Sequence, residues 1–547
     1  MTILKHFCLL LKPPLRRFCD NIILFYNDNV ITSKAQPLHI PEINLPEFIW
    51  QNLDKWPDRT AITCLETGKS YTYAQLYKSS LSIAHFLRDS LKLERQDTVG
   101  VVLPNVPEYP IIVLGAVQAG LRVTTINAQY TSDEIRRQLE NCKSKLVFTL
   151  SALLPVVREA TTNPIVALGT NTDTTGTINF DKLLSKQGDN YIEHAEGNET
   201  VFLPYSSGTT GLPKGVELTH SSIITNLLQL TSPEFCIIPQ ESWKIPGYLP
   251  FCHIYGLVVI LLQSFLQGAT VIAMPKFSAN HLINVLKEHK PDAIFGVPPI
   301  VQLLVQHPNI TSKDLLPLRL ITSGAAPLAP ITIEQLLSKT HNKVKFLEGY
   351  GMTETSAAAI IQTTFLENGF KVGGSGFVLP NTQVKIIPMD GSTLQGLPRN
   401  QPGELVIKGP QVTKGYHNNP DATKSIFIDG WLRTGDLGYF DEHEHFFITG
   451  RLKEMIKVKG FQVAPSELEE VLKQHPRVKD CAVVGIPDSV SGEAPKAFVV
   501  ANSPISDKEL QDFVAKRVSK YKRLKSVKFV QAIPRTATGK ILRHELQ

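Results

Sequence analysis

The sequence predicts a layered α/β protein built from more than one domain. Its 547 residues are too many for one hydrophobic core, because single domains seldom exceed about 250–300 residues. Between residues 45 and 380, apolar strands alternate with helix-like segments, as in helices packed on a buried parallel sheet. Beyond residue 380 the apolar segments shorten and turn β-rich, as at 383–388 and 403–409. We therefore expect layered α/β subdomains in a large N-terminal domain, followed by a small β-barrel-like subdomain.

Three strands are clearest in the N-terminal part of the chain. They cover residues 99–103, 121–126 and 145–150, and the apolar segment 109–120 predicts a buried helix between the first two. The Thr-, Asn- and Gly-rich segment 170–198 predicts a mostly irregular connection. This alternation of strand and helix favours a parallel sheet that is covered on both faces.

Two later strands point to the ligand-binding edge of a sheet. Residues 293–297 and 318–323 are apolar and run into loops that contain glycine and proline. In open α/β sheets, ligands bind in loops at the carboxyl ends of the strands. The most apolar run, 254–274, is broken by polar residues and predicts a buried helix and a strand, with no transmembrane span.

The overall composition excludes several function classes. Hydrophobic residues make up 42% of the chain and charged residues 19%, which is ordinary for a globular protein. The net charge of +6 is small and the cations are dispersed among nearly as many acids, so no nucleic-acid partner is predicted. The seven cysteines form neither a Cys-x-x-Cys pair nor a metal-ligand spacing, which fits a reducing compartment.

The first 26 residues have the profile of an N-terminal extension. They are basic, apolar and free of acids before Asp20, which resembles a mitochondrial transit peptide, although Pro13-Pro14 would interrupt its helix and serine is missing. An unstructured extension is the alternative. The last residues are His-Glu-Leu-Gln, not the Ser-Lys-Leu peroxisomal signal. We expect a mitochondrial or cytoplasmic location.

A polar, glycine-rich loop at residues 205–215 is the strongest functional signal. Its three glycines let the backbone approach an anion, while hydroxyl and N–H groups donate hydrogen bonds and Lys214 adds positive charge. It is not a Walker loop, because Lys214 is followed by Gly215 and no hydroxyl residue. The loop predicts a polyphosphate cradle unlike that of a P-loop ATPase; a flexible surface loop is the alternative.

Three further motifs carry groups that suit a nucleotide. In residues 349–355, Tyr350 can stack on a base and Glu354 is a hard oxygen ligand suited to Mg²⁺. Asp436 lies in a tight turn, where a carboxylate can accept from both ribose hydroxyls. Lys540 lies in a glycine-containing loop and can bridge an attacking carboxylate and a phosphate. Each motif alone also fits a structural turn or a solvated lysine.

Taken in order, these motifs resemble the adenylate-forming (ANL) superfamily of acyl-CoA synthetases, luciferases and peptide-synthetase adenylation domains. The likeness runs from about Ala35 to the C-terminus and is greatest to the 4-coumarate:CoA ligase-like branch of acyl-CoA synthetases. It implies an AMP-binding domain over residues 27–452 and a small, mobile C-terminal α+β domain over 453–547, hinged at Lys453. It also implies ATP, Mg²⁺ and coenzyme A.

The resemblance assigns a role to each matched residue. Lys540 is implied as the adenylation lysine, Glu354 as the Mg²⁺ ligand, and His253 as the gate between acyl pocket and pantetheine tunnel. The implied ATP- or AMP-binding residues are Ser206, Ser207, Gly208, Thr209, Thr210, Lys214, Ala325, Gly349, Tyr350, Thr353, Asp436, Arg451, Lys453 and Lys457. The implied CoA-binding residues are Lys276, Lys459 and Gly460. The implied acyl-pocket residues are His253, Tyr255, Val259, Ala325, Gly349, Ala357 and Ala358.

Four positions depart from the pattern of coumarate ligases. Val259 stands where these enzymes tend to carry a polar residue, and Ala357-Ala358 stand where they tend to carry Pro and Val. Glu348 replaces the usual glutamine. The smaller, apolar walls predict a roomier and more apolar pocket than 4-coumarate requires.

The resemblance implies an ATP-dependent acyl-CoA ligase for a fatty or aromatic acid. The acid would first form acyl-AMP with release of pyrophosphate, and CoA would then displace AMP. A luciferase-like adenylating oxygenase is one alternative, which light output with added luciferin would reveal. A carrier-loading adenylation enzyme is another, although His253 stands where amino-acid activators carry an aspartate.

Overall fold

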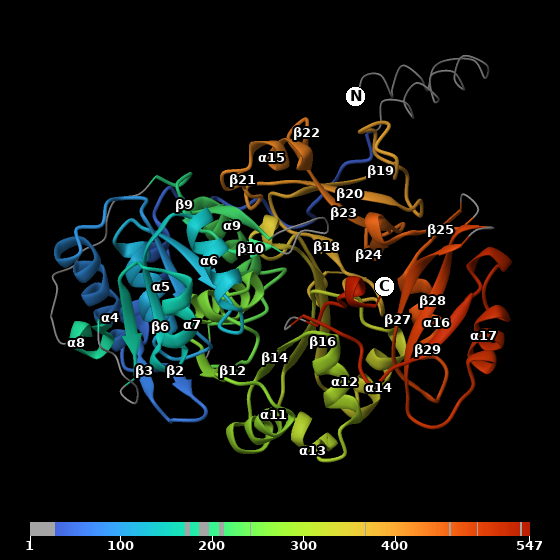
Figure 1. The fold of residues 1–547 in the computed structure, drawn as a ribbon, viewed down its shortest axis with the longest axis horizontal. Coiled ribbons are helices and arrows are strands. Elements are labelled where there is room, and N and C mark those ends of the chain that lie inside the picture. Colours follow the sequence, from blue (N-terminus) through green and yellow to red (C-terminus); the bar gives the residue numbers. More distant parts are fainter. Residues whose placement is uncertain are drawn as a thin grey trace.

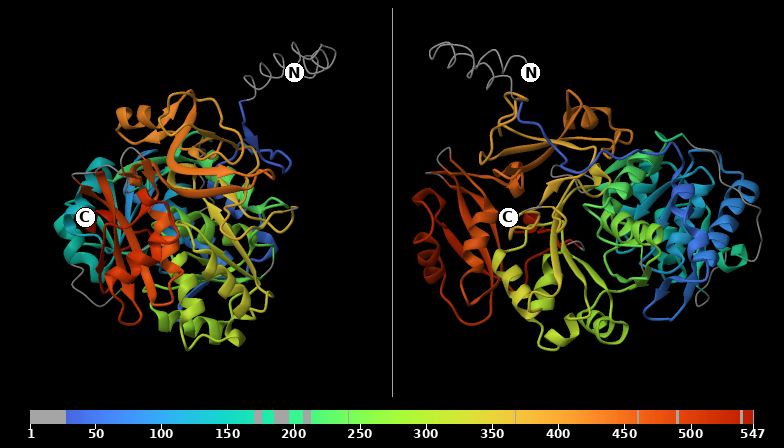
Figure 2. Two further views of the ribbon diagram at one scale, coloured as in Figure 1. Left: turned by 90° about the vertical axis from the view of Figure 1, so that its right-hand side faces the viewer. Right: turned by 180° about the vertical axis from the view of Figure 1, so that it is seen from behind.

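A computed structural model gives the structure of the chain and describes residues 28–169, 176–184, 196–206, 213–240, 242–366, 368–458, 461–488, 491–536 and 539–546. Figure 1 shows a large domain, blue to orange, and a small red C-terminal domain beside it. The C-terminus lies between them. Figure 2 shows the last red segment running back from the small domain toward the large one. This arrangement confirms the predicted division into a large and a small part.

The first sheet contains the three clearest predicted strands. Its strand order is β10-β11-β9-β5-β4-β6-β7-β8, and β21 pairs with β11. Strands β4 to β9 pair in parallel, whereas β11 pairs antiparallel with β9, β10 and β21. The strands are β4 Thr98–Val102, β5 Arg122–Ile126, β6 Ser144–Leu150, β7 Ile165–Leu168, β8 Ile178–Asn179, β9 Thr200–Phe202, β10 Tyr205–Ser206, β11 Lys214–Thr219 and β21 Gly415–Tyr416.

Two further sheets complete the α/β layers. In one, β12 Lys244–Gly247, β13 Thr270–Ala273 and β2 Thr60–Cys64 run parallel, and β3 Ser70–Thr72 pairs antiparallel with β2. In the other, β14, β15 and β16 are parallel, and β17 and β18 continue it in antiparallel pairing. These strands are β14 Ala293–Gly296, β15 Leu320–Ser323, β16 Lys345–Tyr350, β17 Ile360–Ile361 and β18 Phe377–Val378.

Helices pack on these sheets and share one apolar core with them. Every residue of α5 is buried, because this helix is apolar on all sides. The apolar run 254–274 forms η4 and α10 and then β13, as the sequence predicts. The main helices of this domain are α3 Leu45–Trp50, α4 Tyr73–His85, α5 Tyr109–Gln118, α6 Ser132–Asn141, α7 Leu154–Ala160, α9 His220–Thr231, η4 Tyr255–Leu262, α10 Gln263–Gln267, α11 Ala279–Asn284, α12 Pro298–Gln306, α13 Ser312–Leu315 and α14 Pro330–Lys339.

The predicted irregular connection 170–198 contains two short elements in its described residues, 176–184 and 196–198. Its described part contains β8 and α8 Phe180–Leu184, in which Phe180 and Leu183 are buried against the core. Burial of two apolar side chains stabilises a short element that intrinsic propensity alone does not favour.

An antiparallel sheet forms the predicted β subdomain. Its order is β1-β19-β20-β23-β22 with β24 on β23, and it has its own apolar core. Register shifts in the pairings of β20 with β23 and of β23 with β24 bend it, as bulges do. The elements are β1 Ile31–Thr32, β19 Gln383–Ile387, β20 Gly403–Lys408, α15 Pro420–Ile426, β22 Phe427–Ile428, β23 Trp431–Phe440 and β24 Phe446–Arg451.

The small domain is an α+β unit with a separate core. Its sheet has the order β26-β25-β28-β27, with β29 parallel to β28, and α16 and α17 contribute to its core. The elements are β25 Ile456–Val458, β26 Phe461–Val463, α16 Pro465–Lys473, β27 Val478–Asp488, β28 Gly492–Ala501, α17 Asp507–Ala515 and β29 Ser526–Phe529. Across all described residues, we find no helix with the length and apolarity to span a bilayer.

Candidate active site

A cavity of about 820 Å³ lies between the carboxyl ends of β15 and β16, helix η4 and the C-terminal loop. It is lined by most of the residues that the sequence predicts for the site, although they come from distant parts of the chain. The predicted residues in its wall are Ser206, Lys214, His253, Tyr255, Val259, Ala325, Gly349, Tyr350, Thr353, Glu354, Ala357, Ala358, Arg451, Lys453 and Lys540.

The remaining predicted residues fall into two groups. Asp436, Lys276 and Lys457 are described but do not line the cavity; Lys276 and Lys457 are exposed, whereas Asp436 is buried directly behind the wall. Ser207, Gly208, Thr209, Thr210, Lys459 and Gly460 lie outside the described residues. The CoA-binding roles of Lys276, Lys459 and Gly460 therefore stay predictions.

Glu354 marks one end of the cavity. Its side chain is only 4% exposed, and its Oε1 accepts hydrogen bonds from Ser206 Oγ at 3.0 Å and from the Tyr416 hydroxyl at 2.9 Å. Lys214 is the first residue of β11, and its Nζ lies 5.0 Å from the centre of the Tyr416 ring. A carboxylate fixed beside a hydroxyl and a lysine suits a magnesium–phosphate group, because Mg²⁺ prefers one or two carboxylates together with phosphate oxygens.

Asp436 organises the adjacent wall. Its Oδ2 accepts a hydrogen bond from the Tyr350 hydroxyl at 2.7 Å, and its Oδ1 lies 2.8 Å from Arg451 Nε. The tight turn predicted around Asp436 is wrong, because Asp436 lies within strand β23. There it is the direct partner of Arg451 on β24, so the sheet register builds this ion pair. Burial raises the pKa of Asp436, although the charge of Arg451 opposes the shift. The pair therefore fixes the ring of Tyr350 at the cavity surface.

Strained backbone accompanies the small residues of the wall. Ala325 has φ +67°, Ser356 has φ +57° and Ala357 has φ +128°, a region that residues with a Cβ rarely adopt. Such conformations persist only where the surrounding structure enforces them, and they concentrate at functional sites.

Lys540 and His253 both line the cavity, and the charge of Lys540 acts on His253. Burial, together with the charge of Arg451, lowers the pKa of Lys540, whereas nearby acids oppose the shift. Burial and the positive charge of Lys540 lower the pKa of His253 to about 4. The imidazole of His253 is therefore neutral at pH 7 and adds no positive charge to the cavity wall.

The walls near η4 are apolar. Tyr255, one of the polar residues there, already bonds Thr322 Oγ1 at 3.0 Å and donates to the carbonyl of Gly296 at 3.3 Å. Apolar side chains of α9, η4, β14, β16, β17 and the connecting loops line the same cavity: Leu230, Ile237, Val259, Phe295, Leu347, Ala357, Ala358 and Ile361. This part suits an apolar group.

Glu348 is a cavity residue to which sequence reasoning gave no role. It is 8% exposed, its Oε2 has no hydrogen-bond partner among the described residues, and burial raises its pKa to about 8. At neutral pH its carboxyl is therefore mostly protonated and offers one donor and one acceptor, as a glutamine amide does. The sequence signal was present, because glutamine is usual here, but burial was not predictable from it.

We expect Glu348→Gln to raise the melting temperature more at pH 8 than at pH 5. The native pKa lies above the ordinary value of 4.5, so the stability that the neutral carboxyl provides is complete below pH 4.5 and falls until about pH 8. Glutamine does not titrate. Thermal melts of both proteins across this pH range measure the gap, and a gap that stays constant would contradict the assignment.

Comparison with known proteins agrees with this geometry. Residues 49–417 match the family model described as AMP-binding enzyme, and residues 467–540 match AMP-binding enzyme C-terminal domain. The chain belongs to the AMP-binding enzyme family. A 4-coumarate–CoA ligase 3 of Oryza sativa subsp. japonica is 38% identical over 528 residues, which cover 95% of this chain and 94% of the relative. A 4-coumarate–CoA ligase 1 of Solanum tuberosum is 37% identical and covers 95% and 96%.

Solved structures support the same family. A benzoate CoA ligase from Burkholderia xenovorans LB400 superposes with a TM-score of 0.82 at 25% identity, covering 92% of this chain and 99% of its own. The AMP-binding enzyme described here thus has relatives that are AMP-forming acid–thiol ligases, and the predicted superfamily and fold class are confirmed.

Proposed function

We propose that this AMP-binding enzyme is an ATP-dependent acyl-CoA ligase that acts on an apolar fatty or aromatic acid. The observation that carries the proposal is one cavity that combines Lys540, the Glu354 carboxylate and an apolar wall. Lys540 and Glu354 suit the triphosphate of ATP, whereas the apolar wall suits the carbon skeleton of an acid. The names of the relatives, 4-coumarate and benzoate ligases, support the reaction class.

In the first half-reaction, a carboxylate oxygen of the acid attacks the α-phosphorus of ATP. The bond from this phosphorus to the bridging oxygen breaks, and pyrophosphate leaves. Lys540 lies between the two anions, so its charge offsets a repulsion that would otherwise oppose their approach. Its lowered pKa does not remove this role, because the triphosphate would favour the charged form.

Glu354 is the residue that would hold magnesium. Its carboxylate is oriented by Ser206 and Tyr416, which leaves a fixed oxygen ligand beside the expected phosphates. When bound, the ion supplies charge neutralisation at the phosphate oxygens. Tyr350 would stack on adenine, and Glu348, two residues earlier on the same face of β16, would pair with the edge of the base.

In the second half-reaction, the small domain would rotate near Lys453 and withdraw Lys540. The CoA sulfur then attacks the acyl carbonyl carbon, the bond to the AMP oxygen breaks, and AMP leaves. The separate core of the small domain supports movement as a unit. Lys459 and Gly460, next to β25, would then approach the pantetheine chain, and the neutral His253 would permit its passage.

The apolar wall of the cavity limits which acids fit. Val259, Ala357 and Ala358 line it with short side chains, and Tyr255 has its hydroxyl bonded to protein. A polar substituent placed there would lose water without gaining a partner from these residues. We therefore propose that the preferred substrate is an acid with an unsubstituted alkyl or aryl group and not 4-coumarate itself.

The purified protein should form acyl-CoA when incubated with Mg·ATP, CoA and an apolar acid. Mass spectrometry would score AMP, acyl-AMP and acyl-CoA against fatty, benzoic, cinnamic and amino acids. We expect thioester from fatty or unsubstituted aromatic acids, with less from 4-coumarate. Acyl-AMP without thioester would refute the ligase assignment and favour a carrier-loading or oxygenase role.

A further inference from the structure

The loop that carries Lys540 is a pinned hairpin. Arg535 and Ile541 form an isolated antiparallel bridge, and the Leu542 N–H donates to the Pro534 carbonyl at 2.9 Å. Within the hairpin, Lys540 N donates to Thr536 Oγ1 at 3.1 Å, and the Thr536 N–H donates to the Lys540 carbonyl at 2.8 Å. The backbone at Lys540 is therefore fixed by its own loop.

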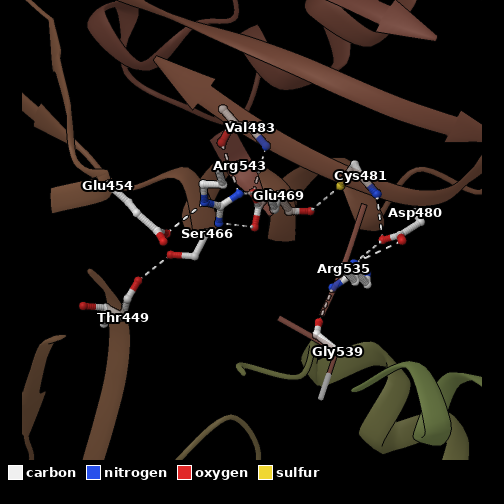
Figure 3. A network of polar contacts seen from close by, with 10 residues as sticks. All are labelled: Thr449, Glu454, Ser466, Glu469, Asp480, Cys481, Val483, Arg535, Gly539 and Arg543. Carbon is white, nitrogen blue, oxygen red and sulfur yellow. Dashed lines mark hydrogen bonds and ion pairs between the residues drawn. The ribbon is translucent and has the colours of Figure 1, made fainter. Parts of the chain in front are cut away.

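Arg535 ties this hairpin to the body of the small domain. Its Nη2 donates to both carboxylate oxygens of Asp480 on β27, at 2.9 and 3.1 Å, and its Nη1 donates to the Gly539 carbonyl at 2.9 Å. Figure 3 shows the guanidinium lying between Asp480 and Gly539. One planar group thus joins the sheet to the residue that directly precedes Lys540, a geometry that lysine cannot reproduce.

The other side of Gly539 rests on the large domain. Gly539 has φ +82°, and a Cβ added there would lie 3.0 Å from Cδ of Pro299 at the start of α12. The backbone next to Lys540 is therefore held between Arg535 of the small domain and Pro299 of the large domain. Arg535 sets how far the lysine reaches into the cavity in this arrangement of the two domains.

We propose that Arg535 is a positioning residue for Lys540, acting through its bridge from Asp480 to Gly539. The proposal rests on the proposed function, because it assigns Arg535 to the adenylation half-reaction alone. The bridge lies wholly in the C-terminal segment, so rotation of the small domain would leave it intact. Once Lys540 has left the cavity, Arg535 has no task in thioester formation.

Arg543 also ties the hairpin to the small domain in Figure 3. Its substitution would not separate the positioning of Lys540 from a loss of stability. It lies at the other end of the hairpin and bonds Glu454 at 2.8 Å and Glu469 at 2.6 Å. Glu469 is buried, and removal of one partner from a buried ion pair destabilises the fold itself. Both arginines are 17% exposed, but Asp480 is 20% exposed whereas Glu469 is 8% exposed, so loss of the Arg535–Asp480 pair perturbs folding less.

The test compares the two half-reactions in Arg535→Ala with wild type. Pyrophosphate release with ATP and acid reports adenylation, and acyl-CoA from added acyl-AMP and CoA reports the second step. We expect kcat for adenylation to fall about 10- to 100-fold with little change in KM for ATP, the effect of a misplaced catalytic group. The second step should stay near wild type, and Arg535→Lys should recover part of the loss.

Two controls make the result decisive. Arg477→Ala removes an arginine that likewise bridges an acid, Glu509, and a carbonyl, Pro504, elsewhere in the small domain, and it should leave both steps unchanged. Asp480→Ala should match Arg535→Ala, and the double variant should be no worse. Equal losses in both steps, or equal behaviour of the Arg535 and Arg477 variants, would overturn the proposal. A wild type that forms no acyl-AMP would instead refute the proposed function.

Discussion

Lys540→Ala is expected to lose acyl-adenylate formation and to keep thioester formation from added acyl-AMP. Lys540 lies in the C-terminal loop of the small domain, and its cation interacts with the charges of Glu354, Asp436 and Arg451. Removal of a preorganised charge from a transition state costs about 10²–10³-fold in rate. In the second half-reaction the CoA sulfur attacks the uncharged acyl carbonyl carbon of acyl-AMP and not its anionic phosphate, so no cation is needed to bring two anions together. Pyrophosphate release and acyl-CoA formation measure the two steps separately.

A matched lysine controls for the loss of surface charge. Lys508 is exposed on α17 of the same domain, and Lys508→Ala should leave both half-reactions unchanged. Lys540→Arg keeps the charge on a longer, planar group and should retain part of the adenylation rate. If Lys540→Ala slowed both steps equally, the assignment of Lys540 to adenylation alone would be wrong.

The sequence located the site well because local motifs carry its chemistry. The end of β16 and the turn after it fix the positions of Tyr350 and Glu354, whereas Asp436 lies within β23 and not in the predicted turn. The structure brings all three residues to one cavity or its wall. Parallel strands place their following loops on one edge, which is a rule that needs no coordinates. The layered α/β class was predictable from the alternation of strands and helices, whereas the small α+β domain was expected only from the family resemblance.

Other features depend on tertiary packing that a motif does not encode. The raised pKa of Glu348 comes from burial by segments distant in sequence, and the Arg535 bridge needs β27 beside the hairpin. The antiparallel pairing of β11 within a mostly parallel sheet and the short helix α8 also depend on neighbours. Intrinsic propensity does not predict such contacts, because burial against distant residues decides them.

Asp436→Ala is expected to lower kcat/KM for ATP by at least about 10²-fold, mainly through a higher KM. A carboxylate that bonds two ribose hydroxyls contributes roughly 1.5–3 kcal/mol for each charged hydrogen bond, and its loss also frees the Tyr350 ring and leaves Arg451 without its partner. If the ribose role is correct, wild type should lose affinity for 2′,3′-dideoxy-ATP while the variant treats it like ATP. Steady-state kinetics with both nucleotides measure this.

The same substitution breaks a buried ion pair, so stability must be separated from binding. Asp441, in the same β subdomain, is also buried and pairs with Lys371. Asp441→Ala should therefore lower the melting temperature as Asp436→Ala does, because each substitution removes the acidic partner of a cation. It should leave KM for ATP unchanged. Once Asp436 is removed, removing the ribose hydroxyls should cause no further loss of affinity. If Asp436→Ala still binds 2′,3′-dideoxy-ATP more weakly than ATP, other groups hold the ribose.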